Sequence, residues 1–313
     1  MNKAIGIAFS LLVLLAAIFA FAPRPAPTIP PQSIAVETLL LLDVAQAGRR
    51  LIAVGEQGHI VISDDDGATW RPTNSPTTAT LTAVHFHDAQ TGWAVGHDSV
   101  ILNSTDGGTT WRQVQSAPAL QKPLLAVWFS DARNGFALGA YGLFLQTNDG
   151  GASWLQRKIA DNDLHLNAFA ARDDGKLFIA GEAGLLLRSD DHGQIWKALT
   201  SPYQGSFFGI LALRDGGLLA YGLRGKIFRS TDAGETWNAV ETASQATLMD
   251  GAVLADGRVV LAGHSGTVLI SLDQGKTFAQ RQHPGRKHVA ALQANGNDIL
   301  LFGESGVTRF AQR

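Results

Sequence analysis

The chain has 313 residues, of which 45% are hydrophobic and 17% charged, and its formal net charge is −2 at pH 7. The low charge and high apolar content exclude a disordered chain, and the weakly acidic balance argues against a nucleic-acid-binding surface spread over the whole protein. Because the chain contains no cysteine, disulfides, thiolate metal sites and a cysteine nucleophile are excluded.

Residues 1–22 have the features of an export signal or a membrane anchor. Lys3 is followed by Ala4–Ala22, a stretch without a charged residue. As a helix, such a stretch would measure about 28 Å at ~1.5 Å per residue, close to the ~30 Å hydrocarbon core of a bilayer. Ala20-Phe21-Ala22 resembles a signal-peptide cleavage site, but Pro23 directly after it disfavours cleavage.

An uncut anchor is therefore the favoured interpretation, and a cleaved signal peptide that leaves a soluble protein is the alternative. Residues 23–31 are rich in proline and predict a linker. Both interpretations place residues 32–313 outside the cytoplasm, in the periplasm, with a membrane anchor at the N-terminus in the first case.

Residues 32–313 contain a repeat that decides the fold class. An eight-residue pattern, Ser/Thr-x-Asp-x-Gly-x-x-aromatic, which we call the acidic box, recurs every 41 to 43 residues. Its six copies are Ser63–Trp70, Ser104–Trp111, Thr147–Trp154, Ser189–Trp196, Ser230–Trp237 and Ser271–Phe278. A Gly-x-x-Gly pair precedes each box and occurs once more near the C-terminus, so the chain has seven units; in the second unit Ser99 replaces the later glycine.

Each unit contains four short apolar runs bounded by Gly and Asp, which is typical of strands, and no segment after the linker shows a sustained helical period. A period of about 42 residues with four strands predicts a β-propeller. The predicted fold is therefore all-β, a seven-bladed β-propeller of four-stranded antiparallel blades, preceded by one N-terminal hydrophobic helix. An open β-solenoid is the alternative.

The seventh unit ends without a box or a fourth strand, which would leave an open sheet edge. Residues 33–37 have Ile34 and Val36 alternating with polar or small residues and stand before the first unit. We expect residues 33–37 to pair as the missing outer strand of the last blade and so to join the two ends of the propeller.

The acidic box is interpreted as a structural turn between the third and fourth strands. Its aspartate can accept hydrogen bonds from the turn's own N–H groups, and its aromatic residue can pack between blades. The aspartates are Asp65, Asp106, Asp149, Asp191, Asp232 and Asp273, and the aromatic residues are Trp70, Trp111, Trp154, Trp196, Trp237 and Phe278. Catalytic or calcium-binding roles are disfavoured, because one aspartate per blade places these carboxylates far apart around the ring.

These boxes resemble the Asp-box, or BNR, repeat of sialidases, some glucanases, sortilin-type receptors and the photosystem II assembly and stability factors. Residues 32–313 are most similar to the last group, in seven units, a box in almost every blade and phrases such as Thr91-Gly92-Trp93-Ala94-Val95-Gly96. The resemblance implies a partner role at membrane or envelope complexes, exporters among them, and a basic patch as binding surface. The nearest basic cluster here is Arg281, Arg286, Lys287 and His288.

The Gly-x-x-Gly turns and the loops between blades are expected on one face, and the boxes on the other. Ligand sites of propellers usually lie on the first of these faces, near the axis. The candidate binding residues there are Glu56, His97, Tyr141, Glu182, Arg224, His264, Glu304, Tyr203, Arg286, Lys287 and His288. An ordinary solvated rim is the competing interpretation. His85 and His87 could form a zinc pair, but partly polar strand packing is the favoured reading.

The sequence therefore predicts a non-enzymatic, extracytoplasmic protein-binding scaffold that acts as an assembly or stability factor for a membrane or envelope complex. It predicts no catalytic residue, no metal, no cofactor and no nucleic-acid partner. The alternative is a sialidase-like or other glycoside hydrolase. That activity would need three arginines and a tyrosine nucleophile, and Tyr141, Tyr203 and Tyr221 are the tyrosines of the chain.

Overall fold

The computed structural model describes residues 2–21, 35–115, 122–295 and 298–310. The chain divides into two compact units at residue 34. The first contains the predicted hydrophobic helix, α1 (Asn2–Phe21). No helix among the described residues is at once long enough and apolar enough to cross a membrane. The predicted linker, residues 23–31, lies outside the described residues.

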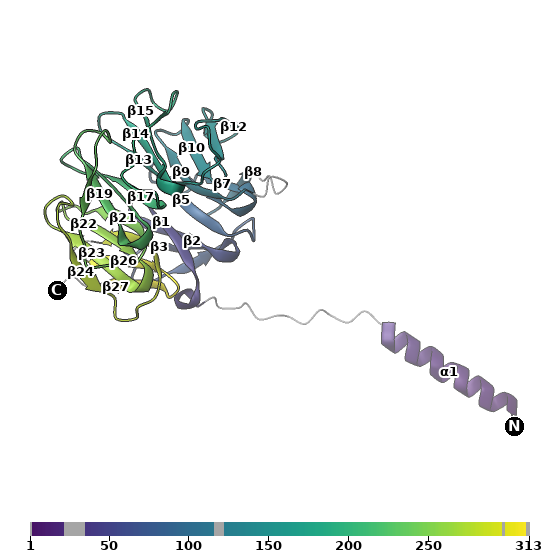
Figure 1. Cartoon of the computed structure of the whole chain (residues 1–313). Coiled ribbons are helices and arrows are strands. Elements are labelled where there is room, and N and C mark those ends of the chain that lie inside the picture. The colour runs from purple at the N-terminus through teal and green to yellow at the C-terminus, as the bar shows by residue number, and fades with distance from the viewer. Residues whose placement is uncertain (1, 22–34, 116–121, 296–297, 311–313) are drawn as a thin grey trace. The chain divides into compact units, whose positions relative to one another are not determined.

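The second unit is the predicted seven-bladed propeller, with blades 1 to 7 in chain order (Figure 1). Blades 1 to 3 consist of β1 (Leu41–Ala47), β2 (Arg50–Gly55), β3 (Ile60–Ser63) and β4 (Arg71–Thr73); β5 (Leu81–Phe86), β6 (Gly92–Gly96), β7 (Ile101–Ser104) and β8 (Arg112–Gln115); β9 (Leu124–Phe129), β10 (Gly135–Gly139), β11 (Phe144–Thr147) and β12 (Leu155–Gln156). All strand pairs are antiparallel, as predicted.

Blades 4 to 7 continue the same meander. Their strands are β13 (Leu166–Ala171), β14 (Leu177–Gly181), β15 (Leu186–Ser189) and β16 (Lys197–Ala198); β17 (Phe207–Ala212), β18 (Leu218–Gly222), β19 (Ile227–Ser230) and β20 (Asn238–Val240); β21 (Leu248–Val253), β22 (Val259–Gly263), β23 (Thr267–Ser271) and β24 (Ala279–Gln282); β25 (Val289–Asn295), β26 (Asp298–Gly303) and β27 (Gly306–Phe310). Within the described residues the last blade thus has three strands.

The ring closes at the first strands of the blades. Each first strand contacts the first strand of both neighbouring blades, and β25 contacts β1 in the same way. Figure 1 shows β1, β5, β9, β13, β17 and β21 around the middle of the propeller. The second strand of each blade is buried along most of its length, as the apolar sequence of β6 illustrates.

The predicted closing strand over residues 33–37 is wrong in its second half. Val36 and Glu37 belong to the 3₁₀ helix η1 (Val36–Thr38), because the Thr38 N–H and hydroxyl both donate to the Ala35 carbonyl. Ser33 and Ile34 lie outside the described residues. The segment still joins the chain's ends, since η1 packs on β27 and the Gly306 N–H donates to the Leu39 carbonyl at 3.0 Å.

The acidic boxes form nearly identical turns between the third and fourth strands. In the first box, Asp65 Oδ1 accepts from the Thr69 N–H and the Ser63 hydroxyl, whose oxygen accepts from the Gly67 N–H. Gly67 has φ +78°, and a Cβ there would lie 2.4 Å from Leu300 of blade 7. The fifth box position therefore needs glycine both for its conformation and for the close approach of the preceding blade.

The box aromatics pack at the boundaries between blades. Trp70 meets Phe302 of blade 7 edge-on, with ring centroids 5.6 Å apart. Trp111 joins a cluster of buried side chains from blades 1 and 2 that includes Ile52 and Phe86. Each aromatic thus contributes apolar burial to two sheets at once, which holds neighbouring blades together.

A second contact ties each box to the preceding blade. The fourth and fifth residues of each box have positive φ. A long side chain of the preceding blade donates to the carbonyl of the fourth residue, or of the fifth in the Gly193 pair, at 2.9–3.2 Å. The pairs are Arg50 with Gly107, Trp93 with Gly150, Arg157 with Gly193, Arg188 with Ala233, Arg229 with Gln274 and Arg309 with Asp66. We call these contacts the blade clamps.

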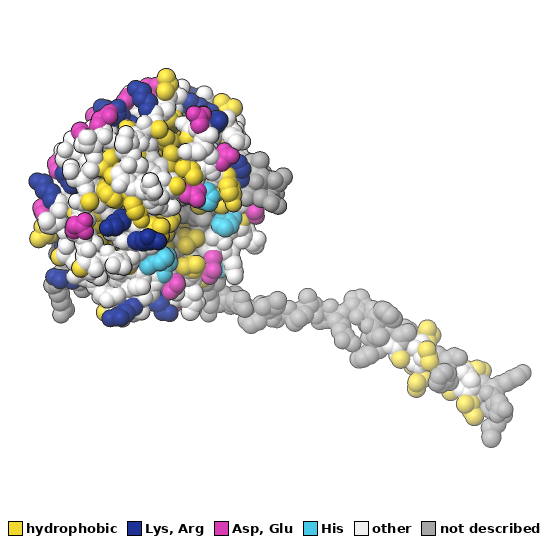
Figure 2. Space-filling model, in the orientation of Figure 1, with side chains coloured by type: hydrophobic (Ala, Val, Ile, Leu, Met, Phe, Trp, Pro, Cys, Tyr) yellow, Lys and Arg dark blue, Asp and Glu magenta, His cyan; other side chains and the backbone are white. Residues whose placement is uncertain are grey.

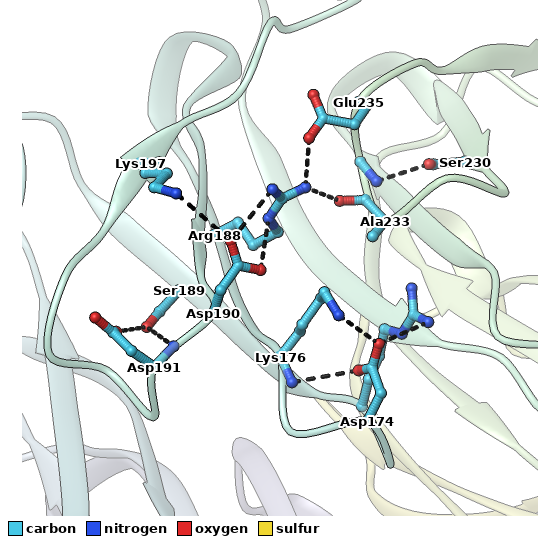
Figure 3. Close-up of polar contacts among 12 residues, drawn as sticks. Asp174, Lys176, Arg188, Ser189, Asp190, Asp191, Lys197, Ser230, Ala233 and Glu235 are labelled. Atoms are coloured by element: carbon cyan, nitrogen blue, oxygen red, sulfur yellow. Dashed lines mark hydrogen bonds and ion pairs between the residues drawn. The ribbon is translucent and has the colours of Figure 1, made fainter.

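Figure 3 shows the clamp between blades 4 and 5. Arg188 is paired with Asp190 of its own blade, and it donates to the Ala233 carbonyl and to Glu235 of the next blade. The Arg309 clamp reaches from the last blade to the first box and so helps to close the ring.

Removal of a well-buried clamp should lower the stability of the propeller. The Arg229 side chain is only 9% exposed and also pairs with Asp215. We expect Arg229→Met to lower the free energy of unfolding by about 2–3 kcal/mol, because hydrogen bonds of a charged donor are lost and an acid is left unpaired. The measurement is urea-induced unfolding.

The matched control is Arg71→Met. Arg71 pairs with Asp64 of its own blade on the surface and is not in a blade clamp among the described residues, so its loss should cost less than about 1 kcal/mol. Equal costs for the two variants would contradict a special role for the clamps.

Candidate functional site

The Gly-x-x-Gly turns connect the second and third strands and line the face opposite the boxes, which we call the loop face. In every blade the N–H after the first glycine donates to the carbonyl just before the first strand; in blade 4, Glu182 donates to His165 at 2.9 Å. A Cβ on the first glycine would lie 2.0–2.5 Å from that carbonyl oxygen in all seven blades. Glycine is thus required for close approach, and each turn is fixed to the start of the innermost strand.

Each innermost strand contains a β-bulge next to this point, where the pairing register shifts by one residue. The bulged residues are half-buried and line one central cavity. They are Leu42, Thr82, Leu125, Asn167, Phe208, Met249 and Ala290. We call them the bulge ring; five of the seven are apolar, which makes the entrance to the cavity largely hydrophobic.

The cavity, which we call the channel, has a volume of about 660 Å³ and is lined by the first strands of all seven blades. His165 and His288, which precede their first strands, line it at the loop face, and His85, Trp128 and Leu211 line it deeper along the strands. Figure 2 shows hydrophobic side chains across the middle of the visible propeller face, with basic side chains beside them and charges of both signs around the edge.

Four polar side chains of the innermost strands reach across to the next blade. Asp43 Oδ2 accepts from the Val84 N–H and Asp250 Oδ2 from the Leu292 N–H, both at 2.8 Å. Thr82 donates to the Leu124 carbonyl and Asn167 to the Phe207 carbonyl, at 2.6 and 2.7 Å. These bonds satisfy edge groups that would otherwise face the channel unpaired.

Asp43 and Asp250 are enclosed by the channel wall but keep part of their surface open to the channel. Burial and the nearby Asp250 charge raise the pKa of Asp43 to about 7. Burial raises the pKa of Asp250 to about 6. Burial also lowers the pKa of His85 to about 4, so this imidazole is neutral at pH 7. The sequence prediction missed all three residues as members of one site.

Three residues of the loop face come together between blades 3 and 4. The rings of Tyr141 and His165 meet edge-on with centroids 4.9 Å apart, and His165 Nε2 lies 3.9 Å from Glu182 Oε2. Tyr141 is 53% exposed. Tyr141 and Glu182 were predicted as candidates, and His165 connects them to the channel entrance.

A similar group forms between blades 6 and 7 from three predicted residues. His264 and His288 meet edge-on at 4.4 Å, and the His288 N–H donates to Glu304 Oε2 at 3.4 Å. Burial, together with the nearby His264, lowers the pKa of His288. Both groups therefore place a histidine and a glutamate beside the channel.

The other candidates do not form one cluster with these groups. Tyr203 packs against Phe207 and Phe228, and its hydroxyl donates to the Leu223 carbonyl at 3.4 Å, which indicates loop packing. Arg224 occupies the positive-φ position of the blade 5 turn, and Arg286 also has positive φ. The remaining candidates are Glu56 and His97 at the first positions of the turns of blades 1 and 2, and Lys287 in the loop before blade 7.

The described residues that line the channel do not supply the groups of a sialidase, because none of them is an arginine. Tyr141 and Tyr203 lie outside the channel lining, and Tyr221 is the tyrosine that reaches it. Among the described residues there is also no group of three His, Cys, Asp or Glu side chains that could hold a metal ion. A zinc pair of His85 and His87, the interpretation that the sequence disfavours, would need such a group.

Comparisons with known proteins agree with this architecture. The family model described as photosynthesis system II assembly factor YCF48 matches residues 62–121 and 114–253. No curated protein sequence matches the chain.

Solved propellers superpose on the chain at low sequence identity. "YCF48 bound to D1 peptide" gives a TM-score of 0.74 at 21% identity and covers 88% of this chain and 95% of its own. YCF48 from Cyanidioschyzon merolae gives 0.68 at 18%, with 92% and 97% covered. The WD40 β-propeller domain of Doa1 gives 0.69 at 15%, with 88% and 94% covered. These structural similarities support the fold.

The channel carboxyls should make the cost of Asp43→Asn depend on pH. A folded-state pKa raised to about 7 means that the stabilisation by Asp43 is complete below the unfolded value near 4 and is lost as pH rises through 7. Wild-type protein should therefore lose stability relative to Asp43→Asn between pH 5 and pH 8, so that the cost of the substitution shrinks by roughly 2 kcal/mol. Chemical denaturation at each pH measures this.

Asp65→Asn is the control. Hydrogen bonds from Thr69 and Ser63 lower the pKa of Asp65 to about 2, so its contribution is complete above pH 5 and is lost only in acid. Its cost should stay constant between pH 5 and pH 8. A cost of Asp43→Asn that also stays constant would contradict the raised pKa.

Proposed function

Because the chain belongs to the photosystem II assembly factor YCF48 family, we propose that it is a non-enzymatic assembly or stability factor that binds a protein partner at the loop face of its propeller. The proposed partner is a peptide segment of a membrane or envelope protein, and exporters belong to this class. A relative of the family has been solved with a bound D1 peptide, which supports peptide binding as the mode of action.

The channel entrance is the observation that carries this proposal. A cavity of about 660 Å³ with a mostly apolar ring and a few polar groups has the size and character of a binding pocket. The turns around it are held to the innermost strands by backbone hydrogen bonds in every blade. A rigid, preformed entrance reduces the entropy that binding must cost.

The boxes on the opposite face have a different role. Their polar groups are used by their own turns, and their carbonyls accept the blade clamps. Partner binding at the loop face would therefore leave the contacts that hold the ring undisturbed.

Site-specific crosslinking in native membranes tests which face binds. The chain contains no cysteine, so one introduced cysteine can carry a photoreactive maleimide without a competing thiol. Ala183 is exposed in the blade 4 turn of the loop face, and Ala68 is exposed in the first box. We expect Ala183→Cys to crosslink a membrane or envelope protein that mass spectrometry identifies, and Ala68→Cys to give at least about tenfold less of that product. Crosslinks from Ala68→Cys alone, or none from either variant, would overturn the proposal.

We also propose that residues 1–22 export the propeller. Lys3 before the uncharged stretch supports an N-terminus that stays in the cytoplasm and a propeller that lies outside it. The test uses a reporter enzyme that functions only outside the cytoplasm. When this reporter is fused after Arg313, we expect it to show activity. A second reporter that is active only in the cytoplasm serves as the control, and activity of that reporter alone would disprove export.

A further inference from the structure

Two carboxyl groups face the channel without a cation. Each already accepts two backbone N–H bonds: Asp43 from Val44 and Val84, and Asp250 from Gly251 and Leu292. A carboxylate has about four lone-pair directions, so each group retains acceptor capacity toward the channel. No lysine or arginine is among the described residues that line the channel.

Tyr221 adds a hydroxyl near Asp250. It is only 2% exposed, and it reaches the channel from the second strand of blade 5. Two glycines on innermost strands make room for it: a Cβ on Gly209 would lie 2.1 Å from Tyr221 Cζ, and one on Gly251 would lie 2.9 Å from its hydroxyl oxygen. Among the described residues the hydroxyl has no hydrogen-bond partner, although its pKa is raised by burial and by Asp250. The Tyr221 hydroxyl thus lies near the Asp250 charge on the wall of the channel, where it can bond to a ligand.

The opposite wall of the channel is aromatic. Trp128 and Phe169 stack with centroids 4.7 Å apart and an interplanar angle of 26°, and both line the channel. The channel thus has a polar arc that carries Tyr221, Asp250 and Asp43, and an apolar arc from blades 3 and 4.

We propose that the channel binds the guanidinium group of an arginine side chain from a bound peptide, and this inference rests on the peptide-binding role proposed above. A guanidinium carries a permanent positive charge and five donors for the free acceptors of Asp43, Asp250 and Tyr221. Its planar face stacks on aromatic rings such as Trp128. The apolar bulge ring would contact the methylene groups of the bound arginine, because the apolar part of a long charged side chain packs on apolar surface.

An arginine suits this site better than a lysine or a metal ion. A lysine ammonium is strongly hydrated and does not stack as a plane. A bound metal would need more protein ligands than the channel offers, since the described residues contain no suitable group of three.

Titration calorimetry with the full chain in mild detergent tests the inference. The probes are the blocked pentapeptides acetyl-Gly-Leu-Arg-Leu-Gly-amide and its counterpart with citrulline, which has the shape of arginine without the charge. We expect the arginine peptide to bind at least tenfold more tightly. Equal affinities, or no binding of either peptide, would overturn the inference. Binding of agmatine, a free guanidinium compound, without binding of the peptide would overturn the assignment to a peptide side chain.

Variants locate the site. Asp250→Asn should weaken binding of the arginine peptide about tenfold and make its affinity equal to that of the citrulline peptide. Tyr221→Phe keeps the packed ring but removes the hydroxyl, and it should weaken binding of the arginine peptide severalfold. Asp256→Asn, the same change in an exposed turn of the same blade, should leave binding unchanged. Equal effects of Asp250→Asn and Asp256→Asn would contradict the channel site. If the peptides fail but Ala183→Cys still crosslinks a membrane protein, only the arginine site is wrong and the proposed function stands.

Discussion

The hydrogen bond from one blade to the box carbonyl of the next is the contact on which the ring depends. A propeller blade is a small sheet that cannot bury both of its faces alone. The box aromatics supply apolar burial between blades, but apolar burial is not directional and does not fix how one blade is oriented on the next. The clamps fix the orientation of one blade on the next, because a carbonyl exposed by a positive-φ residue accepts a hydrogen bond from one defined donor, as in the Arg229–Gln274 pair. The last clamp, from Arg309 to Asp66, sets the first blade against the seventh. The diameter of the channel follows from this geometry.

The clamps also explain the distribution of arginine. The family resemblance implies a basic patch on the propeller, whereas Arg50, Arg157 and Arg188 each donate to a neighbouring blade at the box face. These guanidinium groups stabilise the ring and are only partly free for a ligand. Recognition at the loop face therefore has to come from the channel entrance and from groups such as His264 with His288.

The repeat made most of the fold predictable, because six boxes and seven turns that begin with glycine repeat the same turn chemistry at a nearly constant spacing. The seven antiparallel blades were predicted for this reason. The closing segment was predicted less well, since the alternation around Val36 was read as a strand, whereas Thr38 bonds back to Ala35 and makes a helical turn. The channel was not predicted. Asp43 and Asp250 do carry a signal, because each is an acid within an apolar run, but only the closed ring shows that both line one channel.

The hydrogen bonds that Asp43 and Asp250 make between the innermost strands of adjacent blades do not require a carboxyl group. At two other boundaries neutral side chains, Thr82 and Asn167, link adjacent innermost strands, and an asparagine or serine oxygen could accept the N–H that Asp43 accepts. The carboxyls instead bring a raised pKa and mutual repulsion, which lower the stability of the fold near neutral pH. Proteins keep such locally unfavourable groups chiefly where a ligand needs them. The excess negative charge, placed beside an unpaired phenol, is therefore the strongest structural reason to assign the channel to a cationic ligand.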